Sequence, residues 1–176
     1  MRKPVHVLDI FLQPGEHYFG DRNTQIRTIL GSCVSMTVWH PHLLVGGMSH
    51  FMMPTRQGKK SIGAKSPLDG KYADEAIKLM LAEMKAIGAL DSKYQVKLFG
   101  GGDMFPNARK SGLQIGEKNV EAALRLLKRH NFACQAMHLG GTGHRNLVFR
   151  VWNGNVWVKH TRINTTWRAA VGKAEE

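Results

Sequence analysis

The sequence contains little cysteine, few acidic residues and no long apolar stretch. Its 176 residues include only two cysteines, Cys33 and Cys134, so no disulfide framework can hold the fold, and each thiol is expected to be free in a reducing compartment. The longest apolar runs have the length of strands, which predicts no membrane-spanning helix. The start, Met1-Arg2-Lys3-Pro4, leads into an alternating segment rather than the apolar run of a signal peptide. We therefore expect a cytoplasmic protein.

The length and the hydrophobic content predict one domain. With 43% hydrophobic residues, the chain can bury a sizeable core, and no internal repeat divides it. We assign residues 1–176 to this single domain and expect its tail, from about residue 164, to be weakly ordered.

Acidic residues are about half as common as basic ones. The chain has 13 Asp and Glu against 25 Lys and Arg, and its formal net charge of +12 predicts an acidic partner surface. The basic residues are scattered, and neither an aromatic RNA-binding signature nor a zinc-finger or helix-turn-helix pattern accompanies them. We interpret them as a solvated basic face that meets an acidic protein, and we expect no nucleic acid as partner.

Strands outnumber helices in the apolar pattern, and several are linked as hairpins and are therefore antiparallel, which predicts an α+β fold. Asn153-Gly154 is a strong signal for a type I′ hairpin turn, and the polar segment 55–71 is a candidate loop over a substrate. The expected strands cover residues 5–12, 24–30, 34–39, 44–51, 95–99, 134–139, 146–152 and 155–159, and the expected helices cover residues 71–87 and 117–129.

Each expected helix carries an apolar stripe that should face a core. In the second helix, the acidic start and the basic end suit the helix dipole. The inward residues are expected to be Tyr72, Ala73, Ala76, Ile77, Met80, Met84 and Ile87 in the first helix, and Val120, Ala123, Leu124 and Leu127 in the second.

A hairpin over residues 34–51 could bring a cysteine and a histidine together. If residues 40–43 form its loop, facing residues have numbers that sum to 83, and Cys33 lies opposite His50. Directly opposed residues share a face of the sheet with Cβ atoms about 4.5–5.5 Å apart, so a thiol could approach an imidazole. A slip of one residue would separate the two side chains, and Gly46-Gly47 could host a bulge that shifts the pairing.

This pair could perform nucleophilic catalysis. A thiolate attacks electrophilic carbon, and His50 could accept the proton of Cys33, stabilise the thiolate as an imidazolium and later protonate a leaving amine. Thr28 could orient the imidazole through its hydroxyl. The turn that contains Gly31 and Ser32 could supply an oxyanion hole, formed by the Cys33 N–H and a neighbouring amide. We also predict that iodoacetamide labels Cys33 faster than Cys134 near neutral pH.

Plainer interpretations of the same residues remain open. Cys33 could be buried and inert, and Cys134, in an apolar run, is expected to be a small buried hydrophobic residue. Cys33 and His50 could bind a metal ion with the histidines of His40-Pro41-His42, although the spacing matches no common zinc pattern. The glycine-rich segment 139–145 lacks the context of a nucleotide-binding loop, and it is either a tight turn or a turn that lines the active pocket.

Six short segments form an ordered set between about Leu8 and Lys159. They are Leu30-Gly31-Ser32-Cys33-Val34, Gly46-Gly47-Met48-Ser49-His50-Phe51-Met52-Met53-Pro54, Phe99-Gly100-Gly101-Gly102, Ile115-Gly116-Glu117-Lys118-Asn119, Gly140-Gly141-Thr142-Gly143-His144-Arg145 and Val156-Trp157-Val158-Lys159. Each segment alone is weakly specific. As an ordered set, they resemble the CheD family, the chemoreceptor glutamine deamidases of bacterial chemotaxis.

The resemblance implies a reaction and the residues that perform it. Cys33 would be the nucleophile, His50 the base, and Thr28 the family's third catalytic residue, a threonine just upstream of the glycine-serine-cysteine turn. The implied reaction converts selected glutamine side chains on methyl-accepting chemoreceptors to glutamate and releases ammonia through a thioester. No cofactor or metal is expected.

The resemblance also implies a fold and partners. Family members have an α+β fold in which mixed, largely antiparallel β-sheets are flanked by helices, similar to that of certain toxin deamidases. Their receptor substrates are acidic and would dock on the basic surface. The protein would meet the membrane only through these receptors. In some bacteria the phosphatase CheC is a further partner, which inhibits deamidation and is itself stimulated. The competing hypotheses are a receptor-binding adaptor in which Cys33 is structural and a basic nucleic-acid-binding domain.

Overall fold

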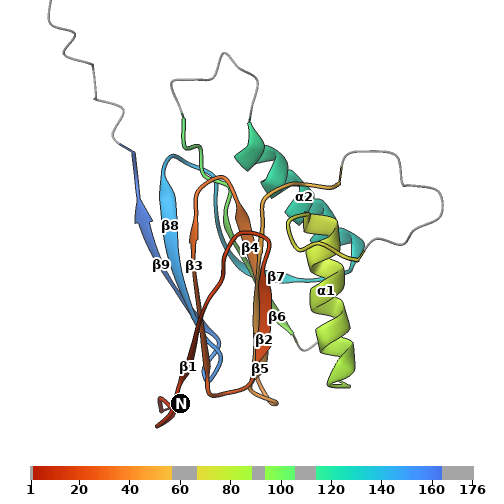
Figure 1. Ribbon diagram of the computed structural model, residues 1–176, viewed down its shortest axis with the longest axis vertical. Coiled ribbons are helices and arrows are strands. Elements are labelled where there is room, and N and C mark those ends of the chain that lie inside the picture. Colours follow the sequence, from red (N-terminus) through yellow and green to blue (C-terminus); the bar gives the residue numbers. More distant parts are fainter. Residues whose placement is uncertain (1, 57–66, 89–93, 106–113, 164–176) are drawn as a thin grey trace, which may run out of the picture.

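The described chain forms three layers (Figure 1). A computed structural model describes residues 2–56, 67–88, 94–105 and 114–163. The elements are, in chain order, β1 (Leu8–Phe11), β2 (His17–Gly20), β3 (Thr24–Leu30), β4 (Val34–His40), β5 (Val45–Phe51), α1 (Ala73–Ala86), β6 (Gln95–Gly100), α2 (Ile115–Arg129), β7 (Cys134–Leu139), β8 (His144–Arg150) and β9 (Asn155–Thr161). A four-stranded sheet, β1-β3-β8-β9, packs on a five-stranded sheet, β2-β5-β4-β6-β7, and both helices cover the other face of the five-stranded sheet.

Two hydrophobic cores separate the layers. The helix core lies between the five-stranded sheet and the helices and includes Met36, Phe51 and Met80. The inter-sheet core lies between the two sheets and includes Leu30 and Met48. Because β4 is central and has a core on both sides, all seven of its residues are buried.

The predicted α+β class is confirmed, with strand pairings of both directions. The pairings β1–β3 and β6–β7 are parallel, and the other five pairings between the described strands are antiparallel. The sequence did not predict β2, a four-residue strand at the edge of the five-stranded sheet, because it has no period-2 alternation of apolar and polar residues. None of the described helices has the length and apolar character needed to cross a bilayer.

The hairpin of β4 and β5 is confirmed, but its predicted register is wrong. Val45 faces His40 and His50 faces Ser35, so facing numbers sum to 85 and residues 41–44 form the loop. The loop starts one residue later than predicted because Leu44 adopts a left-handed conformation (φ 52°) that ends the turn there. This displacement changes each partner by two residues. It therefore leaves every side chain on its predicted face.

The hairpin of β8 and β9 is also confirmed, with a different turn from the predicted one. Arg150 faces Asn155, and residues 151–154 form a four-residue loop rather than a two-residue type I′ turn. Type I′ needs positive φ at both central residues, whereas of Asn153 and Gly154 only Gly154 has it (φ 69°).

The two helices differ in how well their buried faces were predicted. In α1 the predicted stripe is buried from Ala73 to Met84, while Ile87 lies beyond the helix and is 44% exposed. In α2 the prediction that Leu124 faces the core is wrong, since it is 40% exposed, and the polar Asn119 is fully buried in its place. The buried residues of α2 are Gly116, Asn119, Ala122, Ala123, Leu126 and Leu127.

Candidate active site

The turn formed by Gly31, Ser32 and Cys33, here called the GSC turn, connects β3 in one sheet to β4 in the other. All three of its carbonyl groups accept hydrogen bonds. Gly102 N–H donates to Gly31 O at 2.8 Å, Gly101 N–H donates to Cys33 O at 2.7 Å, and Asn119 Nδ2 donates to Ser32 O at 3.0 Å. The turn is therefore held from the side of β6 and α2.

Glycines allow this close approach. Gly100 and Gly101 have positive φ values of 113° and 66°, which side chains rarely adopt. A Cβ at Gly100 would also collide with Cys33 O, and a Cβ at Gly116 would lie 2.7 Å from Gly101 O. These glycines thus let α2 and the 100–102 loop support the GSC turn by direct backbone contact.

His50 lies on the face of β5 that points to the inter-sheet core. His50 is directly opposite Ser35, and Ser35 follows Cys33 by two residues. Cys33 packs against the same inter-sheet core that includes Met48. The backbone of His50 is held on its other side, because Gly15 N–H donates to His50 O at 2.7 Å and His50 N–H donates to Glu16 O at 2.9 Å. Strand pairing thus brings Cys33 and His50 to one face as diagonal neighbours, rather than as the directly opposed pair that was predicted.

Thr28 reaches His50 from the other sheet. Its Oγ1 lies 2.8 Å from His50 Nδ1 and 2.9 Å from the carbonyl oxygen of Leu12. The carbonyl can only accept, so the single hydroxyl proton of Thr28 is donated to Leu12, and Thr28 Oγ1 accepts from Nδ1–H. The imidazole therefore carries its proton on Nδ1. The other ring nitrogen, Nε2, is buried with a free lone pair and no hydrogen-bond partner among the described residues.

Burial keeps both His50 and Cys33 uncharged. Desolvation lowers the pKa of His50 to about 4, against smaller raising effects of the Leu12 carbonyl and the Glu16 carboxylate. Burial raises the pKa of the Cys33 thiol, and the N–H of the same residue opposes this with a smaller effect. This burial disfavours the imidazolium that was expected to stabilise a thiolate. It favours the uncharged forms of both groups, the thiol and the neutral imidazole.

A cavity of about 400 Å³ opens beside Ser32. It is lined by residues 101–105, by residues 114–117 at the start of α2, and by residues 140–142 of the glycine-rich turn. The glycine-rich turn thus lines a cavity that also contains Ser32 of the GSC turn, while neither Cys33 nor His50 is among the lining residues. Arg145, which is 1% exposed, holds this turn by donating from Nη2 to Gly140 O and from Nε to His138 Nδ1.

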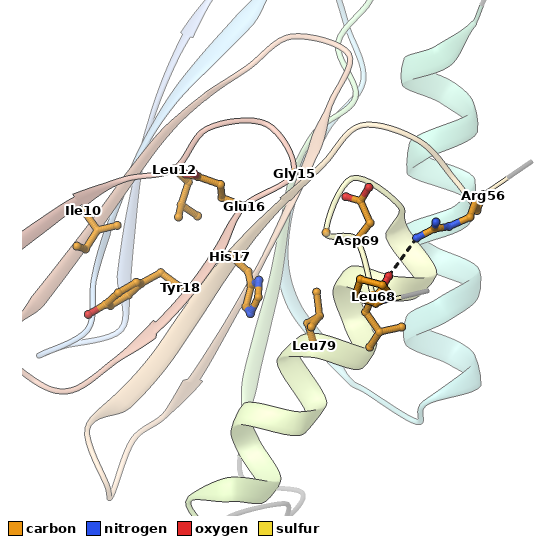
Figure 2. A pocket seen from close by; sticks show the side chains of 12 residues that line it. Ile10, Leu12, Gly15, Glu16, His17, Tyr18, Arg56, Leu68, Asp69 and Leu79 are labelled. Atoms are coloured by element: carbon orange, nitrogen blue, oxygen red, sulfur yellow. Dashed lines mark hydrogen bonds between the residues drawn. The ribbon is translucent and has the colours of Figure 1, made fainter. Parts of the chain in front are cut away.

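A second cavity, of about 710 Å³, is lined in part by Gly15 and Glu16, the two residues before β2 that hold the His50 backbone (Figure 2). Leu12 and Glu16 line it together with Arg56 and residues 67–70, the described flanks of the predicted substrate loop. Arg56 Nη2 donates to Pro67 O at 3.4 Å across the base of this segment. Residues 57–66 lie outside the described residues, as does the predicted tail after residue 163.

The structure does not bring together the residues of the metal alternative. His40 pairs with Val45 at the loop end of the hairpin, whereas Cys33 and His50 lie near the other end. The part of the chain that the structure describes contains no group of three or more His, Cys, Asp or Glu side chains suited to hold a metal ion.

Cys134 is half-buried rather than buried as predicted. It begins β7, the edge strand of the five-stranded sheet, whose middle residues are exposed. An edge position leaves one side of the strand without a neighbour, which the apolar composition of the run did not reveal.

Asn119 was missed as a site residue by reasoning from the individual residues. It lies three, four and seven residues before Ala122, Ala123 and Leu126, so it occupies the apolar stripe of α2. A polar residue on such a stripe was the available signal. Its burial needs a hydrogen-bonding reason, and the carbonyl of Ser32 supplies one.

The fold and this geometry define an α+β protein with a cysteine, a neutral histidine and an orienting threonine at the junction of two sheets. Residues 52–160 match the family model described as CheD chemotactic sensory transduction. A protein of Pseudomonas savastanoi pv. phaseolicola named "Probable chemoreceptor glutamine deamidase CheD" is 50% identical over 162 residues, covering 91% of this chain and 89% of that protein. The chain belongs to the CheD family.

Other bacteria have similar proteins. "Probable chemoreceptor glutamine deamidase CheD 2" of Albidiferax ferrireducens is 51% identical over 157 residues, covering 89% of this chain and 87% of that protein. "Probable chemoreceptor glutamine deamidase CheD 1" of Leptospira interrogans is 40% identical over 163 residues, covering 89% of this chain and 95% of that protein. The Pseudomonas alignment leaves out less than a tenth of this chain, so it spans both Cys33 and His50.

Proposed function

We propose that this protein hydrolyses the side-chain amide of glutamines on methyl-accepting chemoreceptors, giving glutamate and ammonia, with Cys33 as nucleophile. The names of its relatives support the reaction and the substrate. The observation that supports the mechanism is the hydrogen bond between Thr28 and His50, since it leaves Nε2 of a buried, neutral imidazole free to accept a proton.

The first half of the reaction forms a thioester. Cys33 Sγ attacks the amide carbon while the thiol proton moves to His50 Nε2, and the carbonyl oxygen becomes an oxyanion. The Cys33 N–H and a neighbouring amide of the GSC turn stabilise this oxyanion. The C–N bond then breaks as the proton on Nε2 passes to the leaving nitrogen, which departs as ammonia.

The second half releases glutamate. Water attacks the thioester carbon while His50 Nε2 takes one of its protons, and a second oxyanion forms at the same place. The C–S bond breaks, and the proton on Nε2 returns to Cys33 Sγ as the thiol. Atoms balance as glutamine plus water giving glutamate plus ammonia, and the enzyme returns to its starting state without a cofactor.

The neutral resting state fits this mechanism. Separating charge between Cys33 and His50 before the substrate arrives would be costly, because burial disfavours both the thiolate and the imidazolium. When the thiol proton moves during attack, the negative charge passes directly to the oxyanion, where backbone N–H groups oriented in advance can stabilise it.

The net charge of +12 suits an acidic protein substrate. Such a charge accelerates encounter with the acidic surface of a receptor helical bundle more than it strengthens the final complex. We propose a cytoplasmic enzyme that meets the membrane through its receptors. Where its organism has the phosphatase CheC, addition of CheC is expected to slow the reaction.

The test incubates the purified protein with the cytoplasmic fragment of a chemoreceptor and follows glutamine residues by peptide mass spectrometry. The wild type is expected to convert specific glutamines to glutamate, whereas Cys33→Ala and His50→Ala are not. Cys134→Ala is the matched control and should retain the activity. Equal conversion by all four proteins, or none by the wild type on several receptors, would reject the catalytic assignment. Binding of receptor without conversion would favour the adaptor hypothesis.

A further inference from the structure

We propose that Asn119 is a positioning residue for this reaction, which fixes the direction of the Cys33 N–H and the placement of His50. The inference rests on the proposed function. It is drawn from the two hydrogen bonds that join one buried carboxamide to both halves of the site.

The Asn119 side chain connects the GSC turn to the end of β5. Its Nδ2 donates to Ser32 O at 3.0 Å and to Met52 O at 2.7 Å. Both acceptors are carbonyl oxygens, so the amide nitrogen must face them and the orientation of the group is unambiguous. Asn119 is fully buried, and its Oδ1 has no hydrogen-bond partner among the described residues. The two donated bonds are the polar contacts that these residues give to this side chain.

The bond to Ser32 controls the proposed oxyanion donor. Ser32 C=O and Cys33 N–H belong to one planar trans peptide unit, so they point in opposite directions. When Asn119 holds the carbonyl toward α2, the Cys33 N–H must point away from α2. An oxyanion hole depends on donors whose direction is set before the reaction starts, because reorientation during the reaction costs part of the stabilisation.

The bond to Met52 controls the base. Met52 is two residues after His50, and a single carboxamide binds both Met52 O and Ser32 O. Movement of the GSC turn relative to β5 would break one of these bonds. The relative position of Cys33 and His50 therefore depends on Asn119, a residue far from both of them in the sequence, which binds Ser32 and Met52 instead.

The helix that carries Asn119 cannot easily shift. Gly116, one turn earlier in α2, packs directly on the backbone of Gly101 and Gly102, where even a Cβ would lie 2.7 Å from Gly101 O. Gly101 and Gly102 in turn donate to the carbonyls of Cys33 and Gly31. Asn119 thus acts from a support that already contacts the GSC turn.

The test measures kcat and KM for the receptor fragment with Asn119→Leu, which has a similar shape but no donor. The variant is expected to lower kcat by roughly 10-fold or more, up to the roughly 100- to 1,000-fold typical of losing one oxyanion donor, while KM stays within about twofold. Asn119→Ser leaves room for a water molecule to bind the two carbonyls, and is expected to lose less activity. Leu126→Ala, which removes buried α2 packing without touching the GSC turn, is the control and should keep kcat.

Several outcomes would overturn the inference. Wild-type kcat in a folded Asn119→Leu variant would do so, as would a loss of kcat in Asn119→Ser larger than that in Asn119→Leu, or an equal loss of kcat in Leu126→Ala at matched stability. In the unaltered protein, NMR should find slow exchange of the Asn119 side-chain NH2 relative to that of the exposed Asn155; equally fast exchange also counts against it. Retained activity in Cys33→Ala would instead reject the proposed function, so the two failures can be distinguished.

Discussion

Cys33 and Cys134 are both half-buried, and burial raises the pKa of each thiol. They differ in their neighbours. Cys134 lies on an exposed edge strand, where its thiol donates to the carbonyl of Ala136 at 3.3 Å. Cys33 lies on the face that carries His50, in a turn whose three carbonyls are held by hydrogen bonds.

Neither burial nor the direction of the pKa shift therefore distinguishes Cys33, the proposed nucleophile, from Cys134. What distinguishes Cys33 is its position on the face that carries His50, whose Nε2 accepts no hydrogen bond among the described residues, and a backbone whose carbonyls are held by hydrogen bonds. The following predictions test whether that difference decides the chemistry.

The largest difference is expected when each cysteine is replaced in turn. Cys33→Ser should lower kcat by about 10⁴-fold or more, because the nucleophile of a group that acts as a unit is lost. Cys134→Ser should leave kcat within about twofold of the wild type. Steady-state ammonia release from the receptor fragment measures both. Similar losses in the two variants would erase the distinction between the cysteines.

Removing the base should make the two thiols more alike. His50→Gln is expected to lower kcat by about 10²- to 10⁴-fold, the usual contribution of a general base. With the wild type, iodoacetamide should label Cys33 faster than Cys134 near neutral pH, because His50 Nε2 can take the thiol proton of Cys33 during the attack, and the preference should disappear in His50→Gln. Peptide mass spectrometry quantifies the labelling at each site. A preference that persists without His50 would mean that another group activates Cys33.

Thr28 should matter through the orientation of His50. Thr28→Val keeps the shape but removes the hydroxyl that bridges Leu12 and His50, and kcat should fall by roughly 10- to 100-fold, a part of the general-base effect. The unpaired buried groups should also cost about 1–3 kcal/mol of unfolding free energy. Thr24→Val, at a buried position of the same strand, is the control for stability alone. Equal kcat values in the two variants would remove Thr28 from the mechanism.

The smallest effect concerns pH. Because the pKa of His50 is lowered to about 4, the imidazole stays neutral and able to accept a proton well below pH 7, and it becomes protonated only as the pH falls towards 4. Deamidation at pH 5.5 is therefore expected to be within about twofold of that at pH 7.5, whereas an ordinary histidine would reduce it about tenfold. Alkylation of Cys134, which requires a thiolate, should instead rise about tenfold per pH unit over the same range. A tenfold drop in deamidation at pH 5.5 would contradict the neutral-base interpretation.

Local periodicity predicted the parts of the fold that depend on neighbours in sequence. The stripe of α1, the two hairpins and the α+β class follow from apolar spacing and turn residues. The face shared by Cys33 and His50 was predicted despite the wrong register, since a shift of two residues preserves the face.

Tertiary contacts decided what the sequence did not reveal. Which face of α2 is buried depends on Gly116, which packs on the 100–102 loop. This contact joins segments far apart in the chain, so the spacing within the helix could not predict that Asn119 rather than Leu124 is buried. The neutral state of His50 follows from burial between the sheets, which no local pattern reports. The hydrogen bond of Thr28 to His50 joins two sheets, so no local pattern predicts it. The position of Thr28, on the strand that leads into the GSC turn, was the one available indication in the sequence.

Thr28 belongs to the four-stranded sheet and His50 to the five-stranded one, so their bond exists only while the two layers are tightly apposed. A compact intermediate that keeps its secondary structure but loosens its side-chain packing, as a molten globule does, would keep its far-UV dichroism and lose this bond. Turnover would then vanish at a lower denaturant concentration than the dichroism signal. Loss of activity during unfolding would thus report loss of packing between the two sheets, before the strands and helices themselves unfold.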